Sequence, residues 1–218
     1  MTKENNIERY FRWYCEELIK AGYIKRVDRE AESLELVPSI KHKKYKHYKS
    51  KSSTTETFTL FPSRSYTYDF RILWNNKALG YFTELLEKDK PLQNSNPLFI
   101  SQKYLFDGVP EIISYIDVKP HSAAVRFGGG KMASYYTFPF VQRMIYDQSG
   151  VYINKTIPVP SGKHGRSNCL FAKSFTPMRY LKTDKSGDDR KIHYKVHTLT
   201  EYEYEKSKMF NQQNKLEL

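Results

Sequence analysis

The chain has 218 residues, a length that suits one domain with a substantial core. Its 36 lysines and arginines against 24 aspartates and glutamates leave a net charge of +12, so the expected partner is a polyanion, nucleic acid before an anionic membrane surface. No apolar run is long enough to span a membrane, and the N-terminus does not have the form of a signal peptide. Two cysteines outside any Cys-X-X-Cys spacing exclude a disulfide framework and indicate a reducing, cytoplasmic setting.

The first predicted element is a helix over residues 5–20. Asparagine is a favoured N-cap, and Gly22 follows the segment in the way that glycine often ends a helix. Apolar residues recur at helical spacing and predict a buried stripe, formed by Ile7, Phe11, Tyr14 and Leu18. Glu8 falls at one edge of this stripe. There its carboxylate either reaches a site across the sheet or remains a solvated helix charge.

A basic segment occupies residues 41–51, where six of eleven residues are lysine. Runs of this kind are usually solvated loops, yet the interleaved tyrosines and histidines also suit an arm that follows a phosphate backbone. Both interpretations stay open, and contact with nucleic acid is the preferred one. The lysines concerned are Lys41, Lys43, Lys44, Lys46, Lys49 and Lys51.

Residues 65–74 alternate in the manner of a half-buried strand. The pattern predicts that Asp69 stands on one face and that the opposite face is formed by Tyr68, Phe70, Ile72 and Trp74. The following segment, residues 75–110, carries no spacing that marks a ligand set. We expect it to be an insertion near the substrate groove.

Residues 112–120 combine an apolar run with a closely spaced carboxylate and lysine. An apolar, β-branched run predicts a buried strand, and residues two apart in a strand point to the same face. Asp117 and Lys119 therefore project together, while Ile116 and Val118 pack on the other side. A buried carboxylate and ammonium are costly unless paired or given a ligand, so the pair is either a strand-end ion pair, with Asp69 as a surface charge, or part of a functional site.

The remainder of the chain alternates loops with short elements. Arg126 and Lys131 flank three glycines that lack the order of a phosphate-binding loop and suit a substrate loop. A helix is predicted over residues 134–147, entered at Pro139, with Gln142 as a polar side chain that reaches the site or the nucleic acid. A strand is predicted at 150–158, loops around one short strand at 170–175 fill 159–195, and a charged helix covers 198–210.

The order of these elements resembles the PD-(D/E)XK nuclease superfamily, and in particular its small phage- and prophage-borne members. Glu8 matches the glutamate of the family's first helix, Asp69 the aspartate of its aromatic-X-Asp-Phe strand, and Asp117-Val118-Lys119 its Asp-Val-Lys. The resemblance runs loosely over residues 7–157, with a large insertion between the two strands. It departs from the family after the lysine, where a glycine is usual and Pro120 stands here.

The resemblance implies one α/β domain over residues 1–218. Its core, about 5–158, would hold a mixed sheet of four or five strands with a helix on each face, a basic insertion at 41–64 and a loop-rich extension at 159–218.

It also implies a metal-dependent endonuclease acting in the cytoplasm of a phage-infected or prophage-bearing bacterium. Asp69 and Asp117 would bind Mg²⁺ or Mn²⁺, with Glu8 as a third ligand directly or through water and the Val118 carbonyl completing the shell. Lys119 would assist at the attacking water or the phosphate.

The expected substrate is DNA, with branched, flap or junction structures favoured, and a resolvase would act as a homodimer. Two alternatives stay open. One is a non-catalytic nucleic-acid-binding protein on the same scaffold, and the other is a basic partner of an acidic protein.

Overall fold

The computed structural model describes residues 4–29, 32–47, 53–88, 90–92, 94, 96–120, 132–160, 169–182, 190, 192 and 194–216. Over these residues the elements are α1 (Asn6–Lys20), β1 (Ile24–Arg29), β2 (Ser33–Val37), β3 (Ile40–His47), β4 (Ser53–Phe61), β5 (Arg64–Thr67), β6 (Phe70–Trp74), η1 (Asn76–Ala78), β7 (Thr83–Leu85), β8 (Phe99–Phe106), β9 (Val109–Val118), α2 (Met132–Ser149), β10 (Ile153–Thr156), α3 (Leu170–Lys173), α4 (Met178–Lys182) and α5 (Leu199–Leu216).

The centre of the described chain is a mixed six-stranded sheet. Its order is β1-β6-β9-β8-β7, and β10 lies beside the second half of β9. Strands β1, β6, β9 and β8 are antiparallel in turn, whereas β7 runs parallel to β8 and β10 parallel to β9. The mixed α/β class is confirmed. The sheet is wider than the four or five strands expected because residues 75–110 contribute β7 and β8.

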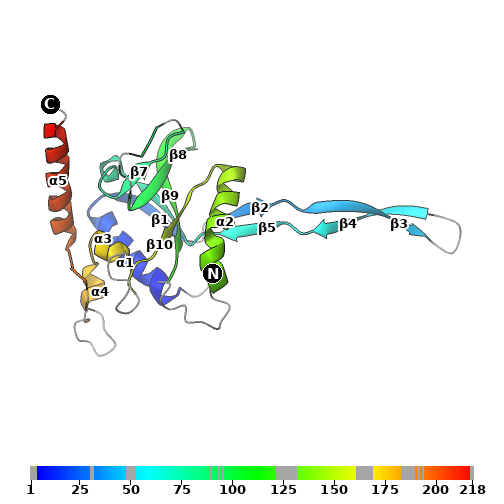
Figure 1. The fold of residues 1–218 in the computed structure, drawn as a ribbon, viewed down its shortest axis with the longest axis horizontal. Helices are drawn as coiled ribbons and strands as arrows, with labels where there is room; N and C mark the ends of the chain where they lie inside the picture. Colours follow the sequence, from blue (N-terminus) through cyan, green and yellow to red (C-terminus); the bar gives the residue numbers. More distant parts are fainter. Residues whose placement is uncertain are drawn as a thin grey trace.

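Helices cover both faces of the sheet, with α2 on one face and α1 together with shorter helices on the other (Figure 1). On one face α1 buries Phe11, Tyr14 and Leu18 in a cluster with the side chains of β6 and β9, and α3 and α4 add to the same cluster. On the other face α2 buries Phe138 and Ile145 in a second cluster. The helix predicted over residues 5–20 is present, and the Asn5 side chain accepts two backbone N–H bonds as its N-cap.

The buried Ser114 hydroxyl ties three strands together. It accepts a hydrogen bond from the Trp74 indole nitrogen at 2.9 Å and donates one to the Ile100 carbonyl at 2.9 Å. The fully buried indole therefore has its polar group satisfied in the core.

We expect Ser114→Ala to lower the free energy of unfolding by about 1–3 kcal/mol, because it leaves the Trp74 N–H buried without a partner. Urea denaturation measures the change, and Ser65→Ala on the exposed surface serves as the matched control. A cost for Ser114→Ala no larger than that of the control would mean that this bridge is not stabilising.

Residues 33–47 and 53–67 form a long two-stranded ribbon that projects away from the sheet (Figure 1). Strand β2 pairs with β5 at its root, and β3 pairs with β4 further out. The expected solvated loop at 41–51 is therefore wrong for residues 41–47, which lie in β3. The opposing strand is rich in β-branched threonine, which favours an extended backbone, so the lysine run does not prevent pairing.

The predicted strand over residues 65–74 is broken at Tyr68 and Asp69, where the chain turns from the ribbon into the sheet. As a result Tyr68 does not share a face with Phe70, Ile72 and Trp74. Its ring packs in the second cluster, 5.0 Å from the ring of Tyr115. The other three belong to the first cluster, as their alternation predicted.

The first strand of the central sheet is β1, whereas residues 34–37 belong to the ribbon. Two further expectations are corrected. Helix α2 begins before Pro139, which lies within it with its ring exposed. Residues 170–173 are helical rather than extended, because their apolar side chains pack from α3 onto α1.

The strand predicted over residues 112–120 is present as β9, which ends at Val118. The strand predicted at 150–158 is present as the shorter β10, and the helix predicted at 198–210 is present as α5. None of the helices in the described ranges combines the length and the apolar composition needed to cross a bilayer.

Candidate metal-binding carboxylate site

The candidate site lies where the ribbon enters the central sheet. Asp69 occupies the bend between β5 and β6, and Asp117 lies near the end of the neighbouring strand β9. The backbone N–H of Asp69 donates to the Ile116 carbonyl at 3.0 Å, and one carboxylate oxygen of Asp69 accepts the N–H of Val118 at 2.6 Å. These two bonds fix Asp69 against the strand that carries Asp117.

Asp117 and Lys119 project together, as the strand period predicted. The Lys119 ammonium lies 2.8 Å from Oδ2 and 3.0 Å from Oδ1 of Asp117. The Asp117 side chain is 2% exposed, whereas that of Lys119 is 21% exposed. Although the ammonium is close to Oδ2, that oxygen receives no hydrogen bond of good geometry from the described residues. A buried carboxylate oxygen with unused acceptor capacity is suited to a cation.

Tyr66 of the ribbon is a further member of the site. Its hydroxyl is buried and lies within electrostatic range of Asp117, but it makes no well-directed hydrogen bond to any described group. Burial, followed by the charge of Asp117, raises the pKa of Tyr66 far above its ordinary value, so the hydroxyl stays protonated. Nothing in the sequence distinguishes Tyr66 from the other 17 tyrosines, because its position depends on how the ribbon joins the sheet.

The carboxyl group of Asp69 has a pKa near neutrality. Burial and then the charge of Asp117 raise its pKa to about 6, although the Val118 N–H and the Lys119 ammonium act in the opposite direction. The charge of Glu8 adds to the increase. Asp69, Asp117 and Glu8 are therefore electrostatically coupled.

Glu8 lies in the first turn of α1, at the border of the site. The Arg29 guanidinium holds it at 2.8 Å, and the Asn5 side-chain amide donates to it. Within the described ranges, no three histidine, cysteine, aspartate or glutamate side chains lie close enough together to hold a metal ion. Glu8 thus influences Asp69 through its charge but does not form a three-carboxylate cluster with Asp69 and Asp117.

Mg²⁺ or Mn²⁺ fits the chemistry of the two aspartates. Both ions prefer oxygen ligands and retain several waters, so they do not require a complete set of protein ligands. Two carboxylates about 4 Å apart repel each other by about 4 kcal/mol at an effective dielectric constant of 20, and a cation between them would relieve that repulsion. The Val118 carbonyl was expected as a ligand, and it is the N–H of Val118 that contacts Asp69.

The residues predicted to bind nucleic acid are spread over several elements. Lys41, Lys43 and Lys44 are exposed on the ribbon, whereas the side chain of Lys46 is not described. Gln142 donates to the Ile153 carbonyl at 2.5 Å and so ties α2 to β10. The predicted residues that lie outside the described ranges are Lys49, Lys51, Arg126 and Lys131.

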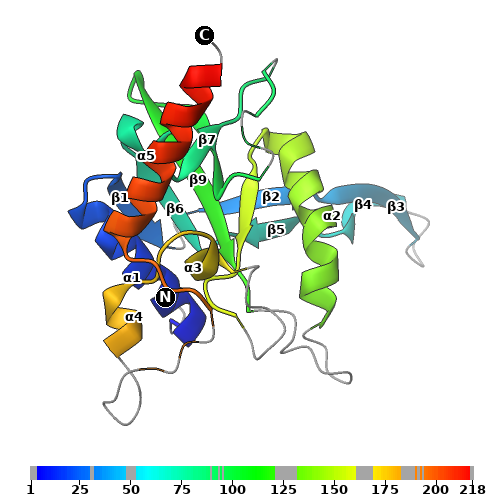
Figure 2. The same cartoon turned by 60° about the vertical axis from the view of Figure 1, so that its left-hand side comes forward.

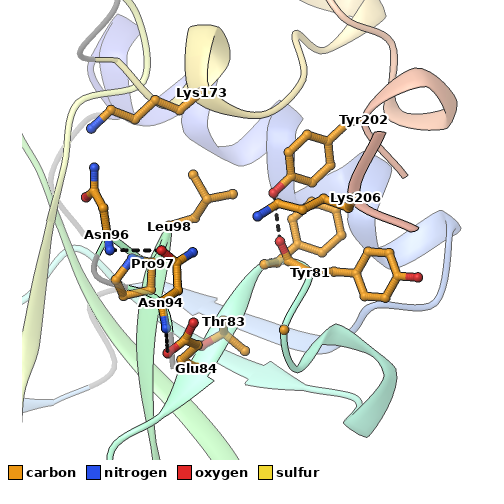
Figure 3. A pocket seen from close by; sticks show the side chains of 12 residues that line it. Tyr81, Thr83, Glu84, Asn94, Asn96, Pro97, Leu98, Lys173, Tyr202 and Lys206 are labelled. Carbon is orange, nitrogen blue, oxygen red and sulfur yellow. Dashed lines mark hydrogen bonds between the residues drawn. The ribbon is translucent and has the colours of Figure 1, made fainter. Parts of the chain in front are cut away.

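A cavity of about 200 Å³ lies elsewhere, between the segment that precedes β8 and the helices α3 and α5 (Figure 3). Lys173 and Lys206 border it, and the Tyr202 hydroxyl closes one side by donating to the Tyr81 carbonyl at 2.7 Å. Glu84 is the one carboxylate among its described lining residues, and it accepts the Asn94 N–H. A single engaged carboxylate offers neither a metal pair nor an acid–base pair, so the aspartates remain the stronger candidate.

No protein-family model, curated protein or solved structure matches this chain. Its function is therefore inferred from sequence pattern and geometry.

Proposed function

We propose that the protein is a metal-dependent endodeoxyribonuclease of the PD-(D/E)XK type. The observation that carries the proposal is the meeting of Asp69 with Asp117 and Lys119, where β6 and β9 lie side by side. The two aspartates are coupled strongly enough that Asp117 helps to raise the pKa of Asp69 to about 6. Strongly perturbed carboxyl groups of this kind are more common at functional sites than elsewhere.

The order of the elements supports the same proposal. A helix that carries Glu8 is followed by the strand after Asp69, the strand that holds Asp117, the helix α2 and the strand β10. The superfamily resemblance implies this order and a helix on each face of the sheet. The packing of α1 and α2 on opposite faces is consistent with it.

Each residue of the proposed site has a separate role. The Val118 N–H orients Asp69, and Asp117 holds the Lys119 ammonium beside the carboxylates. This ammonium supplies positive charge to the scissile phosphate and orients the attacking water. Arg29 holds Glu8 at the border, where its charge favours the presence of a cation. A metal ion bound by the two aspartates would polarise the phosphate and lower the pKa of a bound water.

DNA with a branch, flap or junction is the proposed substrate, processed during phage replication or recombination. The +12 net charge and the exposed lysines of the ribbon support a polyanionic partner. A homodimer would supply the paired cuts that a four-way junction needs.

The test is cleavage of labelled four-way junction, flap, single-stranded and linear duplex DNA with Mg²⁺, Mn²⁺ or EDTA. We expect cleavage only with metal, restored when metal is returned after EDTA, and strongest on a branched substrate. Binding without cleavage on every substrate and with both metals would reject the enzyme and favour a silent nucleic-acid-binding scaffold. The Asp117–Lys119 ion pair is the observation that suits this second function. Binding to an acidic protein that competing DNA does not displace would reject both the nuclease and the nucleic-acid-binding scaffold.

A further inference from the structure

The ribbon is joined directly to the candidate site. Its strand β5 ends at Thr67, two residues before Asp69, and Tyr66 of the same strand faces Asp117. The root is also packed against the body, because Leu34, Leu36 and Tyr66 contact the cluster beneath α2. Figures 1 and 2 both show α2 beside β2 and β5 at this root. The direction of the ribbon is therefore set relative to the aspartates.

The two faces of the outer ribbon differ in chemistry. Cross-strand register places Lys41 opposite Thr59 and Lys43 opposite Thr57, so these four side chains share one face. All four are exposed, and together they form a patch of two lysines and two threonines. On the other face Lys44 lies opposite Glu56, and its ammonium is 5.5 Å from the Phe58 ring centre.

The lysine–threonine face suits duplex DNA. A two-stranded ribbon fits the major groove of B-DNA, where lysines contact phosphates and threonines contact phosphates or base edges. Binding of single strands relies on aromatic rings that stack on bases, whereas Lys41, Lys43, Thr57 and Thr59 offer only ammonium and hydroxyl groups.

The length of the ribbon determines how far from the aspartates the lysines contact that duplex. Thr59 and Thr57, the partners of Lys41 and Lys43, precede Asp69 by about ten and twelve residues. At about 3.3 Å per residue, the lysines lie about 33–40 Å along the ribbon from the site. With a rise of about 3.4 Å per base pair, this corresponds to about 10–12 base pairs of duplex.

We propose that the ribbon lies along a duplex that adjoins the cut and contacts it about 10–12 base pairs away, so that the preferred substrate carries a double-stranded flank at least that long. This inference rests on the proposed function, since it places the cut at Asp69 and Asp117. It adds that the substrate carries a double-stranded flank, and it gives the minimum length of that flank.

The test compares wild type with K41T/K43T, which removes both lysines and keeps residues that favour strands. The matched control, K88T/K195T, removes two exposed lysines outside the ribbon. Binding to flap DNA with flanks of 6, 10, 14 and 20 base pairs is measured by fluorescence anisotropy in EDTA, so that cleavage does not interfere.

For the wild type we expect affinity to rise about tenfold between the 6- and 14-base-pair flanks. K41T/K43T should lose this rise, match wild type on the 6-base-pair flank, and show a salt dependence shallower by about two units in the slope of log K against log salt. Equal loss on all flanks, an equal effect of K88T/K195T, or affinity that does not depend on flank length would overturn the inference.

The two proposals fail in different ways. Binding that depends on flank length and on the ribbon, without cleavage under any metal, would reject the nuclease and leave the duplex contact intact. Metal-dependent cleavage with no dependence on flank length or on Lys41 and Lys43 would reject the ribbon contact alone.

Discussion

Replacement of Asp117 by asparagine is expected to lower metal-dependent DNA cleavage at least about 1,000-fold. The amide keeps the shape of the side chain but removes the charge that would bind the metal. Metal stabilisation of the transition state is worth several kcal/mol, and each 1.36 kcal/mol corresponds to a factor of ten in rate. Initial rates on the preferred branched substrate, with Mg²⁺ and with Mn²⁺, give the measurement.

The fold should survive this change. Lys119 is 21% exposed, so its ammonium can turn to solvent when its partner loses its charge. The substitution also removes the repulsion that Asp117 exerts on Asp69, and the pKa of Asp69 should therefore fall from about 6 towards its ordinary value. NMR titration of the Asp69 carboxyl carbon would measure this decrease in pKa. If Asp117 and Lys119 formed only a structural ion pair, far from Asp69, the pKa of Asp69 would not change.

Asp147→Asn is the matched control, because Asp147 is an exposed aspartate paired with Arg143 on α2. It should leave cleavage unchanged. If Asp117→Asn does not fold, as shown by the loss of a cooperative thermal unfolding transition, the Asp117–Lys119 pair is structural. Full activity with an intact fold would remove Asp117 from the proposed chemistry.

Elements with an apolar period could be predicted from the sequence. Helix α1 could be predicted from its apolar period and strand β9 from its continuous apolar, β-branched run, and the i, i+2 rule placed Asp117 and Lys119 on one side. Strand β1 shows no such period, because it is held partly by charge. Its Asp28 accepts hydrogen bonds from Arg71 of the neighbouring strand, and polar pairs of this kind leave no hydrophobic pattern to detect.

The ribbon illustrates the same limit. Strand β3 does not alternate between apolar and polar residues, and in β4 the alternation is limited to Phe58 and Leu60 among threonines. A lysine-rich segment of this kind has the composition of a loop, and only its pairing with β4 makes it a strand. The site was predictable where residues are close in sequence, as in Asp117-Val118-Lys119. The position of Tyr66 near Asp117 and the ion pair between Glu8 and Arg29 depend on long-range packing, so the sequence did not predict them.

The raised pKa of Asp69 predicts that this residue destabilises the fold at alkaline pH. The carboxyl titrates near 6 in the folded protein and near 3.8 in an unconstrained chain, so the folded state binds its proton more tightly. The associated stability is fully present below about pH 4 and is lost as the pH rises through 6. At 1.36 kcal/mol per pKa unit, the loss at pH 8 is about 3 kcal/mol at most.

Asp69→Asn should therefore unfold at higher urea than the wild type at pH 8, and the two proteins should converge near pH 4. The asparagine side-chain oxygen can still accept the Val118 N–H, so the substitution removes charge while keeping the bond. Asp147→Asn should show no comparable gain. Mg²⁺ at pH 8 should stabilise the wild type, whose ionised aspartates bind it, and leave Asp69→Asn almost unchanged. An Asp69→Asn variant less stable than wild type at pH 8 would show that the charge of Asp69 supports the fold, and it would contradict the repulsion from which the metal site is inferred.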